Sequence, residues 1–131
     1  MENIDAFIKA QEAKNTARGN ITAKNAVHRY MKSVDDEREV STISEKKLNI
    51  ILCNFIIEGR KLDGGNYEPD VLSTMIRSLQ RYLNEEKYIV NILKDSQFAR
   101  MRETLASKRK QMKKTNKIVA TRLLTYLYSV H

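Results

Sequence analysis

Apolar residues recur at the helical spacing of three and four positions in three separate stretches of the chain. The first stretch predicts an amphipathic helix that ends near Ser33, with Thr16 or Thr22 as the candidate cap at its start. An acidic run at 35–39 follows and predicts a solvated linker. The apolar face of this first helix consists of Ala23, Ala26, Val27, Tyr30, Met31 and Val34.

Two further stretches predict helices on either side of a turn. The second helix begins near Ser44, whose hydroxyl can accept a hydrogen bond from an unpaired amide, and the third begins at Pro69, whose missing N–H costs nothing at a first helical position. Between them, residues 63–69 hold three of the chain's five glycine and proline residues, which predicts a turn. The apolar positions are Leu48, Ile51, Leu52, Phe55 and Ile56 in the second helix and Val71, Leu72, Met75, Ile76, Leu79 and Leu83 in the third.

The last third of the chain has a thinner apolar pattern. An irregular piece at 87–93 leads to a fourth helix, predicted from Asp95 or Ser96 to Lys114. Its far part, 108–117, has almost no apolar face and is predicted to be an exposed arm. Residues 118–131 turn apolar again and either dock on the core or wait for a partner. No strand-like alternation persists, so the predicted fold class is all-α.

Length and composition fit one ordinary domain and exclude two classes of small domain. The 131 residues, 41% apolar and 31% charged, can bury a core without a disulfide or a metal. Cys53 is the only cysteine, and with two histidines it cannot complete a four-ligand zinc site. No apolar run approaches the roughly 20 residues of a membrane span, and the charged segment Met1–Ala10 does not fit a signal peptide. We therefore expect an intracellular protein with no membrane partner.

The net charge of +8 is unevenly distributed. Residues 1–69 hold 11 basic and 11 acidic side chains, whereas residues 70–131 hold 13 and 5. Such a localised excess attracts a polyanion, although a lysine-rich helix that only keeps the protein soluble fits the charge equally well. Arg77 and Arg81 stand four residues apart and so share one face of the third predicted helix, away from its apolar stripe.

Catalytic chemistry has no candidate in this sequence. The Gly64-Gly65 pair lies between two helices and lacks the spacing of a nucleotide-binding loop. His28 lies at the apolar edge of the first predicted helix, where a structural role is the simplest interpretation. No cysteine or serine is placed with a histidine and an acid that would converge on it. We therefore expect no enzyme activity, no cofactor, no metal and no small-molecule substrate.

One run of residues is more specific than helical patterning. Residues 54–69 read NFIIEGRKLDGGNYEP, and they combine an arginine-lysine pair, an aspartate-glycine turn and a tyrosine-glutamate-proline entry into the third helix. The residues that accompany this run, in chain order, are Asn15, Thr16, Val27, Tyr30, Met31, Ile43, Ser44 and Leu48 before it, and Leu72, Ile76, Arg77, Leu79, Arg81, Tyr82, Leu83, Phe98, Arg102, Leu105 and Lys108 after it.

On these residues the chain from Thr16 to Lys114 resembles the N-terminal core-binding (SAM-like) domain of tyrosine recombinases, in particular of Crypton-type recombinases and the domesticated zinc-finger MYM-type proteins. The resemblance implies a compact bundle of four to five helices over 15–114, preceded by an extension at 1–14 and followed by an apolar tail at 115–131. It also implies a nuclear protein that forms one jaw of a clamp on duplex DNA. Gly59 departs from the bulky residue that is more usual there.

The resemblance selects Thr16, Arg77 and Arg81 as contacts to the DNA backbone. Charge alone adds Arg18, Lys24, Lys61, Arg109, Lys110, Lys113 and Lys114. Only fourteen residues follow Lys117, too few for the catalytic domain of a recombinase, so we expect binding without cleavage. A fragment of a longer recombinase is a further possibility. The alternative function is a protein-interaction adaptor that has lost DNA binding and docks a partner or a second copy through Leu123–Val130.

Overall fold

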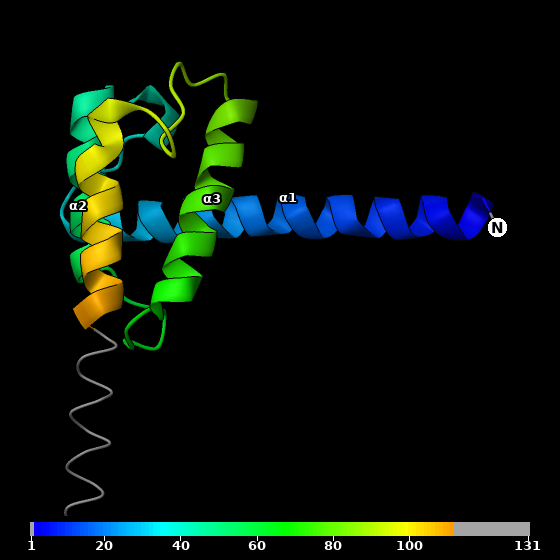
Figure 1. The fold of residues 1–131 in the computed structure, drawn as a ribbon, viewed down its shortest axis with the longest axis horizontal. Coiled ribbons are helices and arrows are strands. Elements are labelled where there is room, and N and C mark those ends of the chain that lie inside the picture. The colour runs from blue at the N-terminus through cyan, green and yellow to red at the C-terminus, as the bar shows by residue number, and fades with distance from the viewer. Residues whose placement is uncertain (1, 112–131) are drawn as a thin grey trace, which may run out of the picture.

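The computed structural model describes residues 2–111 and shows an all-α bundle of four helices (Figure 1). The helices are α1 (Glu2–Ser33), α2 (Glu45–Glu58), α3 (Pro69–Glu85) and a last helix over residues 99–111, which is described as far as residue 111. No helix among these residues combines the length and the apolar character that crossing a bilayer requires.

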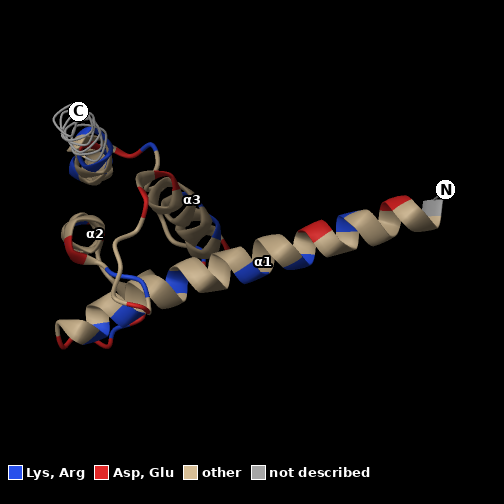
Figure 2. Ribbon diagram, turned by 90° about the horizontal axis from the view of Figure 1, so that it is seen from below, with Lys and Arg blue, Asp and Glu red and all other residues tan. Residues whose placement is uncertain are grey.

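The helix α1 crosses the other three helices, and its N-terminal half extends well beyond them (Figures 1 and 2). Every residue from 3 to 19 is exposed, and burial starts at Asn20. The predicted start at Thr16 or Thr22 is wrong, because the helix begins at Glu2. Strong helix formers such as Ala10, Ala13 and Lys14 stabilise the N-terminal half of α1. The spacing of apolar residues did not predict this half, because it buries no side chains.

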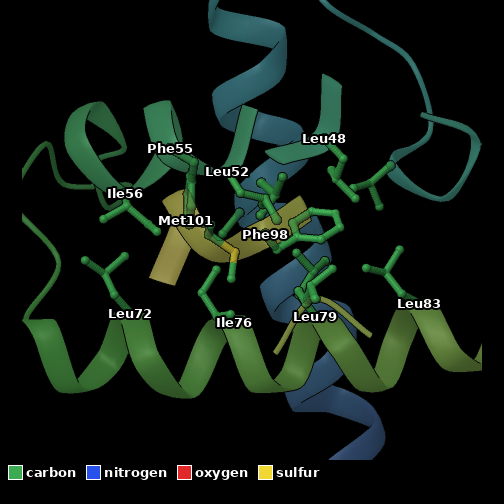
Figure 3. Close-up of a cluster of buried hydrophobic side chains, with 14 of the residues drawn as sticks. Leu48, Leu52, Phe55, Ile56, Leu72, Ile76, Leu79, Leu83, Phe98 and Met101 are labelled. Atoms are coloured by element: carbon green, nitrogen blue, oxygen red, sulfur yellow. The ribbon is translucent and has the colours of Figure 1, made fainter. Parts of the chain in front are cut away.

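The core lies where the apolar stripes of α2 and α3 face each other (Figure 3). Both stripes were predicted from their spacing, and the structure confirms them except at Val71 of α3, which is 46% exposed. Each fully buried side chain of this size contributes roughly 1.5–3 kcal/mol through removal from water. The pairing involves Leu48, Leu52, Phe55 and Ile56 of α2 and Leu72, Ile76, Leu79 and Leu83 of α3, with Phe98 and Met101 between the two helices.

The turn before α3 forms as predicted. Gly64 has a φ of +87°, a left-handed conformation that favours glycine, and the Asp63 carboxylate accepts a hydrogen bond from the Gly65 amide at 2.8 Å. Tyr67 folds back into the core beside Phe55, with ring centroids 5.9 Å apart. The turn is therefore anchored in the core, which fixes the position at which α3 starts.

Two irregular segments supply core residues that the periodicity could not reveal. The predicted solvated linker after α1 leads into a short 3₁₀ turn, η1 (Val40–Thr42), and Val40 is completely buried. The irregular piece at 87–93 contains Ile92, whose buried amide donates to the Gln80 side chain at 2.6 Å. A buried amide without a partner would cost about 1–3 kcal/mol, so Gln80 stabilises this loop.

The last helix follows a 3₁₀ turn, η2 (Ser96–Phe98), which the Asp95 carboxylate caps by accepting from the Gln97 amide at 2.8 Å. The predicted helix continues through 108–111, where residues 109–111 are exposed, as the predicted arm implies, and Lys108 is half-buried, contrary to the prediction. The Lys108 ammonium donates to the carbonyl of Ile57 in α2. Residues 112–117 of the predicted arm and the apolar tail lie outside the described residues.

Candidate functional site

Arg77 and Arg81 stand on the outward face of α3, one turn apart and both exposed. The stem of Arg77 lies along its own helix, since its Nε is 3.4 Å from the carbonyl oxygen of Ser73. Neither arginine takes part in any ion pair found among residues 2–111. Their guanidinium charges therefore face solvent without a carboxylate partner in that part of the chain.

A third arginine reaches the same face from the last helix. Arg109 donates to the Ser73 hydroxyl at 3.0 Å and forms an ion pair with the Asp70 carboxylate at 2.9 Å. Asp70 is 92% exposed, so this ion pair is strongly screened by water and contributes at most about 1 kcal/mol. We call Arg77, Arg81 and Arg109 the α3 arginine face; Ser73 contacts both Arg77 and Arg109.

The charge of the last helix accounts for the net charge of the described residues. Residues 2–98 carry fifteen basic and fifteen acidic side chains, whereas residues 99–111 carry five basic and one acidic. Figure 2 shows the basic residues on the ribbon. Lys110 is exposed at the end of this helix, one residue after Arg109.

The other sequence-predicted residues that the structure describes come from α1 and from the loop before α3. Lys24 is half-buried on α1, and its ammonium lies over the ring of Tyr82, 5.4 Å from the centroid. Lys61 is exposed in the loop between α2 and α3, where its amide donates to the carbonyl of Gly65. Lys113 and Lys114 lie outside the described residues.

Thr16 and Arg18 lie on the exposed, extended half of α1. We expected Thr16 at the start of a helix, where unpaired amides can bind phosphate. That expectation is wrong, because Thr16 lies in the middle of a continuous helix whose amides are already used.

Two basic residues that sequence reasoning left out meet at the C-terminal end of α2. Arg60 donates to the carbonyls of Glu58 and Gly59 at 2.9 and 3.0 Å, and Lys108 donates to that of Ile57 at 3.2 Å. Burial and, second, the nearby Arg60 charge lower the pKa of Lys108. The position of Arg60 just after a predicted helix end was a usable signal, since cations favour that end of the helix dipole. The approach of Lys108 depends on the tertiary fold alone.

No group of three His, Cys, Asp or Glu side chains within 2–111 is placed to hold a metal ion. His28 acts as a structural acceptor, because its Nε2 receives the Val40 amide at 3.1 Å. Burial lowers the pKa of His28. The charge of Glu39 opposes this shift, and the charge of Lys24 adds to it.

The helical bundle described above corresponds to a known domain family. A family model of the QRICH1 domain matches residues 1–112. The chain belongs to the QRICH1 domain family. No curated protein and no solved structure matches it.

The family match corrects the resemblance to tyrosine recombinases. The QRICH1 domain covers the region in which the resemblance lay, and no recombinase core-binding domain matches the chain. The all-α bundle stands, but its assignment as a SAM-like recombinase domain does not. Thr16, Arg77 and Arg81 lose the support that the resemblance gave them. Only the two arginines keep independent support in this QRICH1 domain: both are exposed on α3, and Arg77 shares Ser73 with Arg109.

Proposed function

We propose that this QRICH1 domain binds the phosphate backbone of duplex DNA through the α3 arginine face. The observation that carries the proposal is the pair of exposed arginines on α3, together with Arg109, which reaches Ser73 one turn before Arg77. Arginine binds phosphate through up to two parallel hydrogen bonds, and such contacts release the counterions condensed on DNA.

The geometry supports backbone binding more than base recognition. Arg77 and Arg81 are separated by about 6 Å along the axis of α3, and Arg109 comes from a different helix. The three charges therefore spread over a surface formed by two helices instead of following one recognition helix. Contacts of this kind fix the position of a protein on the duplex without reading its sequence, so we expect weak sequence preference.

The test is a fluorescence-anisotropy titration of a labelled 24-base-pair duplex at about 50 mM salt. The variant R77A/R81A removes two charges from the arginine face, and K46A/K47A removes two charges from exposed positions in the first turn of α2. We expect R77A/R81A to weaken binding by about tenfold or more, because two charge-assisted hydrogen bonds are lost. The control variant should bind within about threefold of the unmodified protein.

Two results would contradict the proposal. Equal losses in both variants would mean that binding follows net charge and has no specific surface. No binding by the unmodified protein at low salt would remove the function itself. Thermal unfolding followed by circular dichroism checks that both variants are folded.

A protein-interaction adaptor is the second candidate, and one observation favours it. The extended half of α1 exposes three large apolar side chains, Ile4, Phe7 and Ile8, at 64%, 68% and 47% of their surface. Such residues mark contact surfaces more often when they cluster. Light scattering after size exclusion measures the oligomeric state. If this candidate is right, the unmodified protein should be an oligomer, and F7S or deletion of residues 118–131 should shift it towards a monomer. A monomer in every case counts against self-association.

A further inference from the structure

A groove runs along α2, from Asn49 to Arg60, between α2 and the last helix, and Arg109 of the α3 arginine face is not among the residues that line it. The residues that matter for the argument are Ile50, Cys53 and Ile57 on α2, Arg100 and Lys108 on the last helix, and Arg60 at the end of α2.

One wall of the groove is apolar. Ile50, Cys53 and Ile57 follow the spacing i, i+3, i+7, so they form a second stripe on α2, separate from the stripe that faces the core. Ile50 and Ile57 are each 53% exposed, and Cys53 is half-buried. A stripe with helical spacing fits the apolar face of another helix.

The rest of the groove is polar, and its charged residues are the three cations Arg60, Arg100 and Lys108 and one carboxylate, Glu103. Lys108 and Arg60 are close enough that the Arg60 charge lowers the pKa of Lys108, and no ion pair among residues 2–111 includes either of them. Each spends donors on the carbonyls at the end of α2, but the lysine ammonium has three donors and the guanidinium five. Arg100 lies two turns before Lys108 and is 81% exposed, with Glu103 at 3.5 Å as its only ion-pair partner within the described chain.

We propose that this groove binds an amphipathic helix with acidic residues beside its apolar stripe, supplied by a partner protein. The apolar face of the partner would cover Ile50, Cys53 and Ile57, and its carboxylates would meet Arg100 at one end and the Lys108–Arg60 pair at the other. The charge of the groove selects an acidic partner over a basic one.

The same geometry sets the spacing that the partner needs. Arg100 and Lys108 are eight residues apart on one helix, which corresponds to about 12 Å along its axis. Acidic residues seven or eight positions apart on the partner helix would reach both. Duplex DNA would satisfy the cations but would leave the apolar stripe uncovered, so the groove favours a peptide.

Cys53 is the only cysteine of the chain and lines the groove, so its alkylation rate reports occupancy. The probe is a synthetic 16-residue helical peptide with leucines at i, i+3 and i+7 and two glutamates eight residues apart. We expect it to slow alkylation of Cys53 by iodoacetamide in the full chain. Two matched control peptides replace the glutamates. The glutamine peptide should bind about fivefold more weakly, and the lysine peptide more than tenfold more weakly.

The variant I50S/I57S changes only exposed positions, so the fold should be retained, and it should abolish protection. Three results would overturn the proposal. The first is equal protection of Cys53 by all three peptides. The second is protection of Cys53 by a 24-base-pair duplex and not by the acidic peptide. The third is faster alkylation after deletion of residues 118–131 alone, which would mean that the chain's own end fills the groove.

Discussion

At the scale of single residues, His28 links α1 to the segment that follows it. Its ring accepts a hydrogen bond from the Val40 amide, and a protonated imidazole could not accept it. Because burial lowers the pKa of His28 below the usual histidine value of about 6.5, the unfolded chain binds more protons in the interval between the two pKa values. The contribution of His28 to stability is therefore present above about pH 6.5 and is lost as the pH falls through the folded-state pKa.

This gives a pH prediction with an internal control. Between pH 8 and pH 5, the free energy of unfolding should fall less in H28Q than in the unmodified protein, because glutamine can accept the same bond without titrating. The chain's other histidine, His131, serves as the control, and H131Q should keep the original pH dependence. Urea denaturation at four pH values measures both, and identical profiles for H28Q and the unmodified protein would refute the role of His28.

Two glycines are expected to respond oppositely to the same substitution. A Cβ on Gly59 would lie 2.5 Å from the carbonyl oxygen of Phe55, a backbone atom that cannot move aside easily, whereas a Cβ on Gly19 meets nothing closer than 4.0 Å. G59A should lower the free energy of unfolding by about 1–3 kcal/mol. G19A should raise it by about 0.5–1 kcal/mol, because Gly19 adjoins the packed part of α1 beside Ser78 of α3 and alanine favours a helix interior. Thermal melts of the pair measure this, and a stable G59A would show that the end of α2 is arranged differently.

At the scale of elements, α1 contains two halves of different stability. The half beyond the bundle is held by local helix propensity alone, and the half after Asn20 is packed against α3. The substitution A13G should leave the cooperative unfolding transition unchanged within about 0.3 kcal/mol, because the exposed half can open on its own. A26G, at a buried position, should lower the free energy of unfolding by about 1 kcal/mol or more. Equal losses would mean that α1 unfolds as one unit.

The elements also show how far the sequence predicts this fold. The apolar spacing located α2 and α3, because each helix buries one face, and the glycine and proline residues located the turn between them. It missed the N-terminal half of α1, which buries nothing, and the core role of Val40 and Ile92, which lie in segments without a repeat. Local patterns reveal a helix through its buried face, so exposed helices and buried loops escape them.

The candidate site was likewise predictable from the sequence only in part. The four-residue spacing of Arg77 and Arg81 was enough to place them on one exposed face of a helix. The arrival of Arg109 at Ser73 and of Lys108 beside Arg60 depends on how the last helix packs, which no local pattern contains. The exposed-arm prediction failed at Lys108 for a related reason: a polar contact to the carbonyl of Ile57, rather than an apolar face, holds this half-buried residue against α2.

At the scale of the whole molecule, the last helix is bordered by two distinct surfaces. Arg109 belongs to the α3 arginine face, and Lys108 belongs to the groove beside α2. If both proposals hold, DNA and an acidic helix bind at these two surfaces. The acidic peptide should then leave DNA affinity nearly unchanged, while I50S/I57S should lose the peptide and keep the DNA.

The salt dependence of DNA binding tests the central claim most directly. Each phosphate neutralised contributes about −0.9 to the slope of log K against log salt concentration. Measured between about 50 and 200 mM salt, the slope of R77A/R81A should be shallower than that of the unmodified protein by about 1.8, with K46A/K47A unchanged. A slope that is the same in all three proteins would show that Arg77 and Arg81 do not contact DNA, and the account of the α3 arginine face would be wrong.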